Sequence, residues 1–402
     1  MSGRTRVSTQ KSILDIYEAG DFFLASPQRT IIGKGVFTVV EKEKEIENQL
    51  IRLPSRVESA LHHAKKSGDP YPIAMGAVPF DDTGFAEIII PEEVDVSGPM
   101  YMEDEKRNAL LTVDSYDMQA VPNPELYMKG VNQGLEKIAA EHLDKIVISR
   151  ALHFTTKEKV DVKQLLKNLA QHNPQGYTFA VDLSEKGWAN QQKAKEKRTL
   201  IGSSPELLVS KCDHRLFANP LAGSRPRSAD PVEDQRRALE LLNSEKDLYE
   251  HAVVVDMVKE ALTPFCETLD VPESPSLIKT EAMWHLSSEI QGRVKKVETS
   301  SLELAVALHP TPAICGYPTA VARDAIHEIE PFNREFFTGM VGWCDINGNG
   351  EWIITIRCAE VKERSLRLYA GAGVVAGSKA EEELNETSAK FQTMLQAMGI
   401  ED

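Results

Sequence analysis

The sequence ELYMKGVNQGLEKIAAEHLDKIVISR, residues 125–150, contains a helix pattern followed directly by a strand pattern. Apolar residues recur at three- and four-residue steps from Tyr127 to Ala139, which predicts an amphipathic helix over residues 125–143. The run KIVISR at residues 145–150 has three consecutive apolar residues and predicts a buried strand. This stretch therefore predicts a helix and a strand that share one core.

The same two patterns extend through the rest of the chain. Short turns separate many of the strand candidates, which favours antiparallel sheets. The strand candidates are residues 177–183, 199–202, 207–210, 337–344, 352–361 and 365–370. Long helical stretches at 232–263 and 379–398 lie among them, so we predict the α+β class rather than a regular βαβ repeat.

The composition is that of an ordinary soluble globular protein. The chain has 402 residues, 42% of them hydrophobic and 27% charged, which excludes disorder and allows two or three domains or one large one. Its 46 Lys+Arg against 61 Asp+Glu give a net charge of -15. Such a charge disfavours nucleic acid and anionic membranes and favours a small ligand.

The cysteines and the N-terminus indicate a cytoplasmic protein. The five cysteines are scattered and form no CxxC pair, so we expect reduced core thiols. No apolar run long enough for a secretory signal or a membrane-spanning helix occurs in the sequence, so we expect no membrane association.

Two glycine-rich segments resemble ligand-binding motifs. DINGNG at residues 345–350 matches the opening of an EF-hand loop, but its twelfth position is Ile356 and its flanks look like strands, which favours a hairpin turn. GAGVVAG at residues 371–377 lies between a strand and a helix. Its amides and the helix N-terminus could hold a carboxylate or phosphate, and a plain tight turn is equally compatible.

Several charged residues occupy positions where apolar residues are expected. Glu383 and Glu386 lie near the apolar stripe of a C-terminal helix whose start we assign to a Ser378 capping box. They converge at the rim of the core, or form a solvated face with a Glu386–Lys390 pair. Glu250 shares a helix face with apolar residues, so it needs either a divalent ion or a salt bridge, for which Lys246 one turn earlier is the candidate partner.

Two cations lie within predicted strands. Lys145 begins the strand at 145–150, where desolvation would make it a possible base, although strand-end lysines are commonly solvated. Arg357 lies inside the strand candidate at 352–361 and would clamp a carboxylate through paired donors.

Taken together, these segments resemble the chorismate-utilising enzyme family, which includes isochorismate, salicylate, anthranilate and aminodeoxychorismate synthases. The resemblance covers residues 120–400. It rests on DKIVISR (144–150), SPELL (204–208), PLAGS (220–224), SEKD (244–247) with Glu250 and His251, WHL (284–286), HPTPA (309–313), GWCD (342–345), TIR (355–357), and GAG (371–373) with Glu383 and Glu386.

The resemblance implies one large α+β domain over residues 1–402, with two mainly antiparallel β-sheets packed between helices. Residues 1–120 would be a variable N-terminal part, and residues 121–402 the family core with the active site. It also implies Mg²⁺ as cofactor and chorismate as substrate. The implied metal ligands are Glu250, Glu386 and Glu383, the last direct or through water; the implied catalytic pair is Lys145 as base and Glu206 as acid; the implied substrate-binding residues are Gly223, Ser224, His285, Arg357, Gly371, Ala372, Gly373 and Lys390.

Within the family, Lys145 and Ala222 disfavour the two aminating branches, so no glutaminase subunit is expected. The segment GWCDINGNGEW at residues 342–352 resembles isochorismate synthases that feed 2,3-dihydroxybenzoate siderophores. Salicylate synthase, which would also eliminate pyruvate, is the alternative, and Ser224, where Thr is commoner, leaves it open. We expect a monomer or a weak homodimer.

Overall fold

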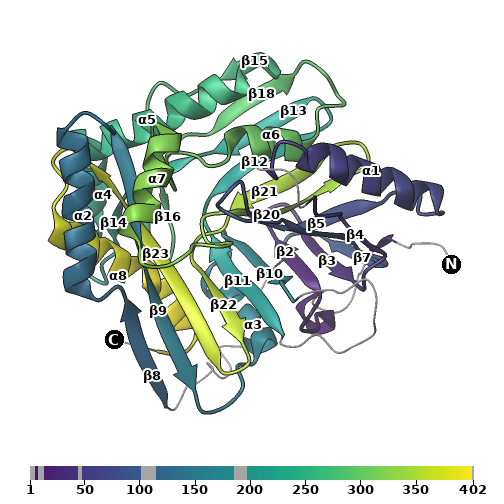
Figure 1. Cartoon of the computed structure of the whole chain (residues 1–402), viewed down its shortest axis with the longest axis horizontal. Coiled ribbons are helices and arrows are strands. Elements are labelled where there is room, and N and C mark those ends of the chain that lie inside the picture. The colour runs from purple at the N-terminus through teal and green to yellow at the C-terminus, as the bar shows by residue number, and fades with distance from the viewer. Residues whose placement is uncertain (1–4, 8–12, 44–47, 101–114, 185–196, 401–402) are drawn as a thin grey trace.

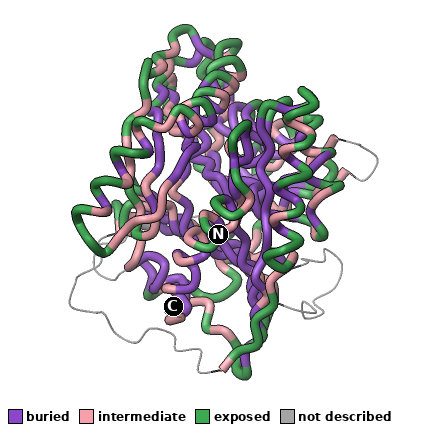
Figure 2. Tube along the Cα trace, turned by 90° about the vertical axis from the view of Figure 1, so that its left-hand side faces the viewer, coloured by how far each residue is buried: buried purple, intermediate pink, exposed green. Residues whose placement is uncertain are grey.

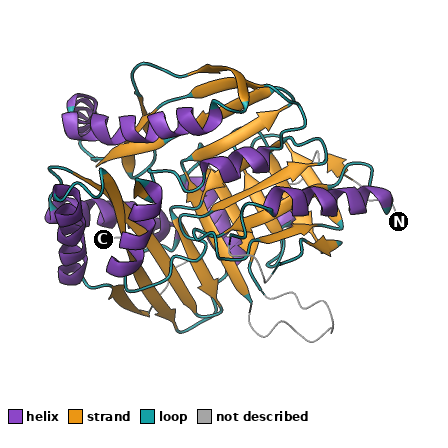
Figure 3. Cartoon of the chain, turned by 45° about the horizontal axis from the view of Figure 1, so that its top comes forward, coloured by secondary structure: helices purple, strands orange, loops and turns teal. Residues whose placement is uncertain are grey.

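Two large β-sheets face each other, and helices cover their outer faces (Figures 1 and 3). The structure is a computed structural model that describes residues 5–7, 13–43, 48–100, 115–184 and 197–400. Nearly all strand pairs are antiparallel, β1 with β7 being parallel. The predicted α+β class with mainly antiparallel sheets is therefore confirmed.

The first sheet has eleven strands in the described part of the chain. In spatial order they are β1 (Thr5–Val7), β7 (Glu93–Ser97), β3 (Thr30–Lys34), β2 (Phe22–Ala25), β10 (Tyr177–Asp182), β11 (Arg198–Ser204), β22 (Cys358–Lys362), β23 (Ser365–Val375), β9 (Lys145–Thr156) and β19 (Gly316–Tyr317), with β8 (Tyr116–Val121) also paired to β9. Strands from the first hundred residues thus join strands from the last fifty in one sheet.

The second sheet has nine strands in the described residues, and a third has three. The second runs β15 (Cys266–Asp270), β18 (Ile290–Val294), β13 (Arg215–Asn219), β12 (Leu207–Cys212), β21 (Gly350–Ile354), β20 (Met340–Asp345), β5 (Ile73–Val78), β6 (Glu87–Ile90) and β4 (Thr38–Val39); the third runs β14 (Leu221–Pro226), β17 (Met283–Ser287) and β16 (Ser276–Lys279). β20 and β21 pair as the hairpin predicted around residues 345–350.

The helices lie outside the sheets, and buried residues fill the space between the layers (Figure 2). The helices are η1 (Ile13–Ile16, a 3₁₀ helix), α1 (Leu53–Lys66), α2 (Pro124–Ala139), α3 (Val162–His172), α4 (Pro231–Asn243), α5 (Glu245–Leu262), α6 (Ser301–Leu308), α7 (Thr319–Ile329) and α8 (Ala380–Ala397). One apolar cluster lies between the two large sheets, and others lie under the helices, so burial of both sheet faces holds the layers together.

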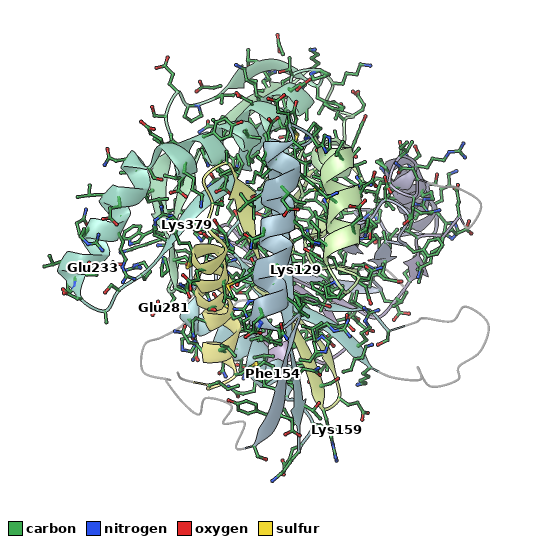
Figure 4. All side chains as sticks on the ribbon, turned by 60° about the vertical axis from the view of Figure 1, so that its left-hand side comes forward. Lys129, Phe154, Lys159, Glu233, Glu281 and Lys379 are labelled. Atoms are coloured by element: carbon green, nitrogen blue, oxygen red, sulfur yellow. The ribbon has the colours of Figure 1, made fainter. Side chains whose placement is uncertain are left out.

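α2 and α8 lie side by side, with Lys129 on α2 and Lys379 just before α8 (Figure 4). None of the helices in the described part of the chain combines the length and the apolarity needed to cross a bilayer. The five cysteines are free thiols; four are buried as expected, whereas Cys212 is exposed.

The described chain passes between sheets at many places, and three of these crossings lie at one junction. β11 of the first sheet leads to β12 of the second, β13 of the second leads to β14 of the third, and β21 of the second leads to β22 of the first. Hydrogen bonds join the crossings: Ile354 N–H donates to the Glu206 carbonyl, and Ser203 N–H donates to the Arg357 carbonyl. Residues distant in sequence therefore meet at one junction of three sheets.

Four local predictions from the sequence were wrong. The helix predicted over 232–263 is two helices, because Ser244 ends α4 and caps α5 through its hydroxyl. Arg357 lies outside the strands, in the crossing between β21 and β22. Gly371 and Gly373 lie within β23 rather than in a loop before a helix. Lys379, not Ser378, is the N-cap of α8.

Candidate active site

A cleft of about 620 Å³, partly open to solvent, lies at the junction of the three crossings. Ten predicted site residues line it: Glu206, Gly223, Ser224, Glu250, His285, Arg357, Gly371, Gly373, Glu386 and Lys390. Lys145, Ala372 and Glu383 are not among its lining residues, although Lys145 pairs with Glu250, which lines it.

Lys145 is completely buried at the start of β9 and forms an ion pair with Glu250 of α5. Its Nζ lies 2.9 Å from Glu250 Oε1. The two side chains meet beside Gly373, where an added Cβ would lie 2.1 Å from Glu250 Oε1 and 3.2 Å from Lys145 Cε. The absence of a side chain at residue 373 therefore makes room for the pair.

Glu206 lies in the crossing between β11 and β12 and is 3% exposed. Burial raises the pKa of its carboxyl to about 7, although a hydrogen bond from Leu221 N–H and the charges of Lys145, Arg357 and Lys390 act in the opposite direction. A carboxyl with this pKa is partly protonated at neutral pH, as a general acid must be.

Arg357 occupies the crossing between β21 and β22 with φ +50°, a left-handed conformation that is uncommon for a residue with a side chain. It is 6% exposed, and no carboxylate of the described residues lies within ion-pair distance. Burial lowers the pKa of Arg357 to about 10, so it stays charged at neutral pH.

His285 of β17 lies beside Arg357, with its Nε2 3.5 Å from the guanidinium. Burial, together with the charges of Arg357 and Lys390, lowers the pKa of His285 well below its usual value. The imidazole is therefore neutral. Glu206, His285 and Arg357, which we call the Arg357 group, together present one charged donor, Arg357, that forms no ion pair among the described residues.

The backbone of Gly371 and Gly373 faces away from β9. Gly371 pairs with Ser149, and Gly373 pairs with Val147. Ser149 N–H and both backbone groups of Val147 bond on the side of β9 remote from β23. In an antiparallel pair, two directly opposed residues direct their N–H and C=O groups either both toward each other or both away from each other. The amides of Gly371 and Gly373 therefore point away from β9.

Within the described residues, β22 pairs with β23 only as far as Leu368. Beyond Leu368, this edge of β23 is not covered by β22, so the amides of Gly371 and Gly373 face the cleft. Lys390 of α8 donates to the Gly371 carbonyl over 2.9 Å, which verifies that this edge is reachable from the cleft. Ala372 has the opposite orientation, so its amide faces β9. Gly371 and Gly373 are thus placed to bind an anion, whereas Ala372 is not.

The three glutamates expected to bind a metal, which we call the glutamate group, each contact a lysine. Glu250 pairs with Lys145, Glu383 with Lys246 at 2.7 Å, and Glu386 with Lys390 at 2.5 Å. The Glu250–Lys246 bridge left open by the sequence is therefore replaced by Glu383–Lys246. The sequence also left open a solvated helix face with a Glu386–Lys390 pair. The pair is present, but both of its residues line the cleft.

The carboxylates of Glu383 and Glu386 repel each other. Burial, followed by the charge of Glu386, raises the pKa of Glu383. Burial also acts to raise the pKa of Glu386, but the charges of Lys390 and Lys246 and the hydrogen bonds from Lys390 and Ser224 together lower it. Two crowded carboxylates on one helix face are the oxygen donors that a hard cation prefers.

The donor chemistry of the glutamate group fits Mg²⁺, while its side chains are directed to lysines. Among the described residues, no three His, Cys, Asp or Glu side chains are gathered closely enough to hold a metal ion. A cation bound there would take over the counter-charge that the lysines supply.

Some cleft residues were not identified from the sequence. Thr338 lines the cleft with φ +57°, and Phe337 stacks on Tyr369 with ring centroids 4.9 Å apart. A β-branched residue in the left-handed region is an outlier. No sequence pattern signals such a conformation, because surrounding contacts impose it.

Comparison of the sequence with models of known protein families identifies the family of this chain. Residues 97–399 match the family model described as chorismate binding enzyme. The chain therefore belongs to the family of chorismate-binding enzymes.

Relatives of known name resemble almost the whole chain. It is 58% identical to isochorismate synthase DhbC of Bacillus subtilis over 389 residues, which cover 97% of this chain and 96% of the relative. It is 42% identical to the vibriobactin-specific isochorismate synthase of Vibrio cholerae over 380 residues, 94% of this chain and 92% of the relative.

A solved structure from Bacillus anthracis, assigned as the 2,3-dihydroxybenzoate-specific isochorismate synthase DhbC, superposes with TM-score 0.89 and 54% identity, covering 96% of this chain and 98% of that one. Anthranilate synthase component I of Streptococcus pneumoniae superposes with TM-score 0.65 at 20% identity, covering 97% and 95%. The latter match shows the shared fold, as the sequence resemblance implied.

Proposed function

We propose that this chain is an isochorismate synthase that converts chorismate to isochorismate for 2,3-dihydroxybenzoate siderophore synthesis. The observation that carries the proposal is a cleft lined by a buried carboxyl, Glu206, whose pKa is about 7, and by Glu250, which pairs with the buried amine of Lys145. The full-length similarity to isochorismate synthases supports the same reaction.

The reaction needs one base and one acid. Lys145 takes a proton from water, whose oxygen then bonds to C2 of the ring. Glu206 donates its proton to the C4 hydroxyl, which leaves as water while the two ring double bonds shift from C1–C2 and C5–C6 to C1–C6 and C4–C5. One water enters and one leaves, so the product is an isomer, and acid–base assistance of this kind supplies about 10²–10⁴ in rate.

Arg357 and the outward amides of Gly371 and Gly373 bind one carboxylate of chorismate. Ser224, Gly223 and His285 line the cleft beside it. Gly223 has φ +77°, a conformation that glycine adopts without strain. These residues orient the ring between the base and the acid.

We propose Mg²⁺ as cofactor, held by Glu250 and Glu386 with Glu383 direct or through water. When bound, it would neutralise the second carboxylate of the substrate. We also propose a cytoplasmic enzyme that is a monomer or a weak homodimer and that works without a glutaminase subunit, since Lys145 and Ala222 favour water over ammonia.

The test is incubation of the pure protein with chorismate and Mg²⁺, with isochorismate measured by chromatography and pyruvate by a coupled assay. Isochorismate without pyruvate is expected. Stoichiometric pyruvate would assign salicylate synthase instead, and complete preservation of chorismate would contradict both activities.

A further inference from the structure

Arg334 and Glu330 form an ion pair in the interior, just after helix α7. Their side chains are each 2% exposed. Arg334 Nε lies 2.9 Å from Glu330 Oε2, and a terminal nitrogen lies 2.6 Å from Oε1. The guanidinium carbon lies 4.7 Å from the ring centre of Phe80 and 5.8 Å from that of Phe337. The pair is therefore bidentate and enclosed by aromatic rings.

The pair completes the edge of β9, the strand that begins with Lys145. β19 pairs with β9 only at Lys145 and Ile146. Beyond it, Arg334 donates to the Val147 carbonyl over 2.8 Å, and Ser149 N–H donates to Glu330 Oε1 over 2.7 Å. The two side chains thus satisfy backbone groups that a further strand would otherwise have to satisfy.

The remaining donors of Arg334 bind two other walls of the cleft. One terminal nitrogen donates to the Ile314 carbonyl over 2.7 Å and lies 3.3 Å from the Thr338 hydroxyl. Val147, Ile314 and Thr338 all line the cleft. Arg334 itself is not among the lining residues, so any effect it has on the reaction passes through these contacts.

Thr338 has a strained backbone conformation that its neighbours must hold in place. Its φ of +57° is unfavourable for a β-branched residue and persists only where neighbours impose it. The Thr338 hydroxyl donates to the Phe337 carbonyl over 2.6 Å, and Thr338 N–H donates to the Thr355 carbonyl over 2.8 Å. The same turn connects to the crossing that carries Arg357.

We propose that Arg334, oriented by Glu330, is a positioning residue that sets β9, the loop at Ile314 and the strained turn at Thr338 relative to one another. The inference rests on the proposed function, because its consequence is the alignment of Lys145 with the substrate. Arg334 touches neither reacting atoms nor substrate. Its role differs from general stabilisation because it joins the three walls at one guanidinium.

The experiment measures kcat, KM and hydrogen exchange in Arg334→Lys and Glu330→Gln. Lysine keeps the charge but cannot make five directed contacts. Arg334→Lys is expected to lower kcat about 10–100-fold, because a displacement near 1 Å costs that much, while KM changes less than about threefold. Deuterium uptake in peptides that contain Ser149 should rise. Glu330→Gln retains an acceptor for Ser149 and should have a smaller effect on both readouts.

The matched control is Arg227→Lys. Arg227 also pairs with a carboxylate, that of Asp234, and stacks on Trp284, but neither of these partners lines the cleft. Its variant should lose melting temperature as Arg334→Lys does but retain kcat and normal exchange near Ser149. A folded Arg334→Lys enzyme with wild-type kcat and exchange would overturn the proposal. A wild-type protein that forms no isochorismate would instead overturn the proposed function, while the exchange readout would still test the anchor.

Discussion

The Arg357 group and the glutamate group share one cleft but balance their charges differently. Arg357 has no carboxylate within ion-pair distance among the described residues, and His285 beside it is neutral. In the glutamate group every carboxylate has a lysine within 2.5–2.9 Å. One group therefore has an uncompensated charge, and the other is neutralised within the chain.

The difference indicates what each group binds. A buried charge without a partner is costly, so Arg357 is complementary to a carboxylate that arrives with the ligand. A buried carboxylate with a lysine partner is stable alone and can exchange that partner for another cation. The first group is prepared for substrate, and the second can accommodate both a metal-free and a metal-bound protein.

Lys145→Ala should have the largest effect, because Lys145 is both the base and the partner of Glu250. We expect kcat to fall by about 10⁴, measured as isochorismate formation. Chorismate binding should remain measurable by calorimetry, since Arg357 is retained. Lys137→Ala, at the exposed Lys137–Glu328 pair, is the control. Undiminished turnover would remove Lys145 from the mechanism.

Glu206→Gln tests the acid in the Arg357 group. Glutamine keeps the shape but has no proton to donate, so a rate loss of about 10²–10³ is expected. In the wild type, the acid is protonated below its pKa, so kcat/KM should fall as pH rises through about 7. The variant should lack this descending limb. The same limb in both proteins would assign the acid to another residue.

Glu386→Ala tests the glutamate group directly. Removal of one carboxylate should weaken Mg²⁺ binding at least about 10–100-fold in a calorimetric titration, by analogy with changes around metal ligands. Glu382→Ala is the control on the same helix, because Glu382 is exposed and pairs with Lys379. If both variants gave the wild-type isotherm, the carboxylates would be structural ion-pair partners only.

The hydrophobic periodicity of the sequence predicted the fold class, but it did not predict where individual helices and strands are interrupted. The strand candidate at 352–361 breaks at Arg357 because the chain changes sheets there, and its sequence TIR continues a strand pattern without any turn residue. The helix break at Ser244 was visible as a capping residue, but the apolar pattern continued through it. Tertiary packing decides such points.

The site was identified mainly from the family resemblance, and of the three ion pairs of the glutamate group only Glu386–Lys390 was offered by the sequence. Lys246 and Glu383 are 137 residues apart in sequence, so helical spacing contains no information about their contact. By contrast, the loop at Asp345 resembles a metal site in sequence, yet the Asp345 carboxylate accepts hydrogen bonds from Asn347 and Asn349 of its own turn. Acid content alone therefore misleads.

Lys246→Met gives the smallest expected effect and separates two interpretations of the lysines. If Lys246 stands in for a cation, its removal leaves Glu383 unbalanced, so the metal-free protein should melt at a lower temperature. Mg²⁺ should then bind about fivefold more tightly, since it no longer competes with an ammonium group whose interaction is worth about 1 kcal/mol.

The matched control for Lys246→Met is Lys379→Met, which removes an exposed lysine at the N-cap of α8, the helix that carries Glu383. It should alter neither the melting temperature nor Mg²⁺ affinity. Weaker Mg²⁺ binding in Lys246→Met with unaltered melting would mean that Lys246 aims Glu383 at the ion rather than replacing it. The Lys246–Glu383 ion pair would then orient the carboxylate toward the metal, and the pair would be present in the metal-bound protein as well.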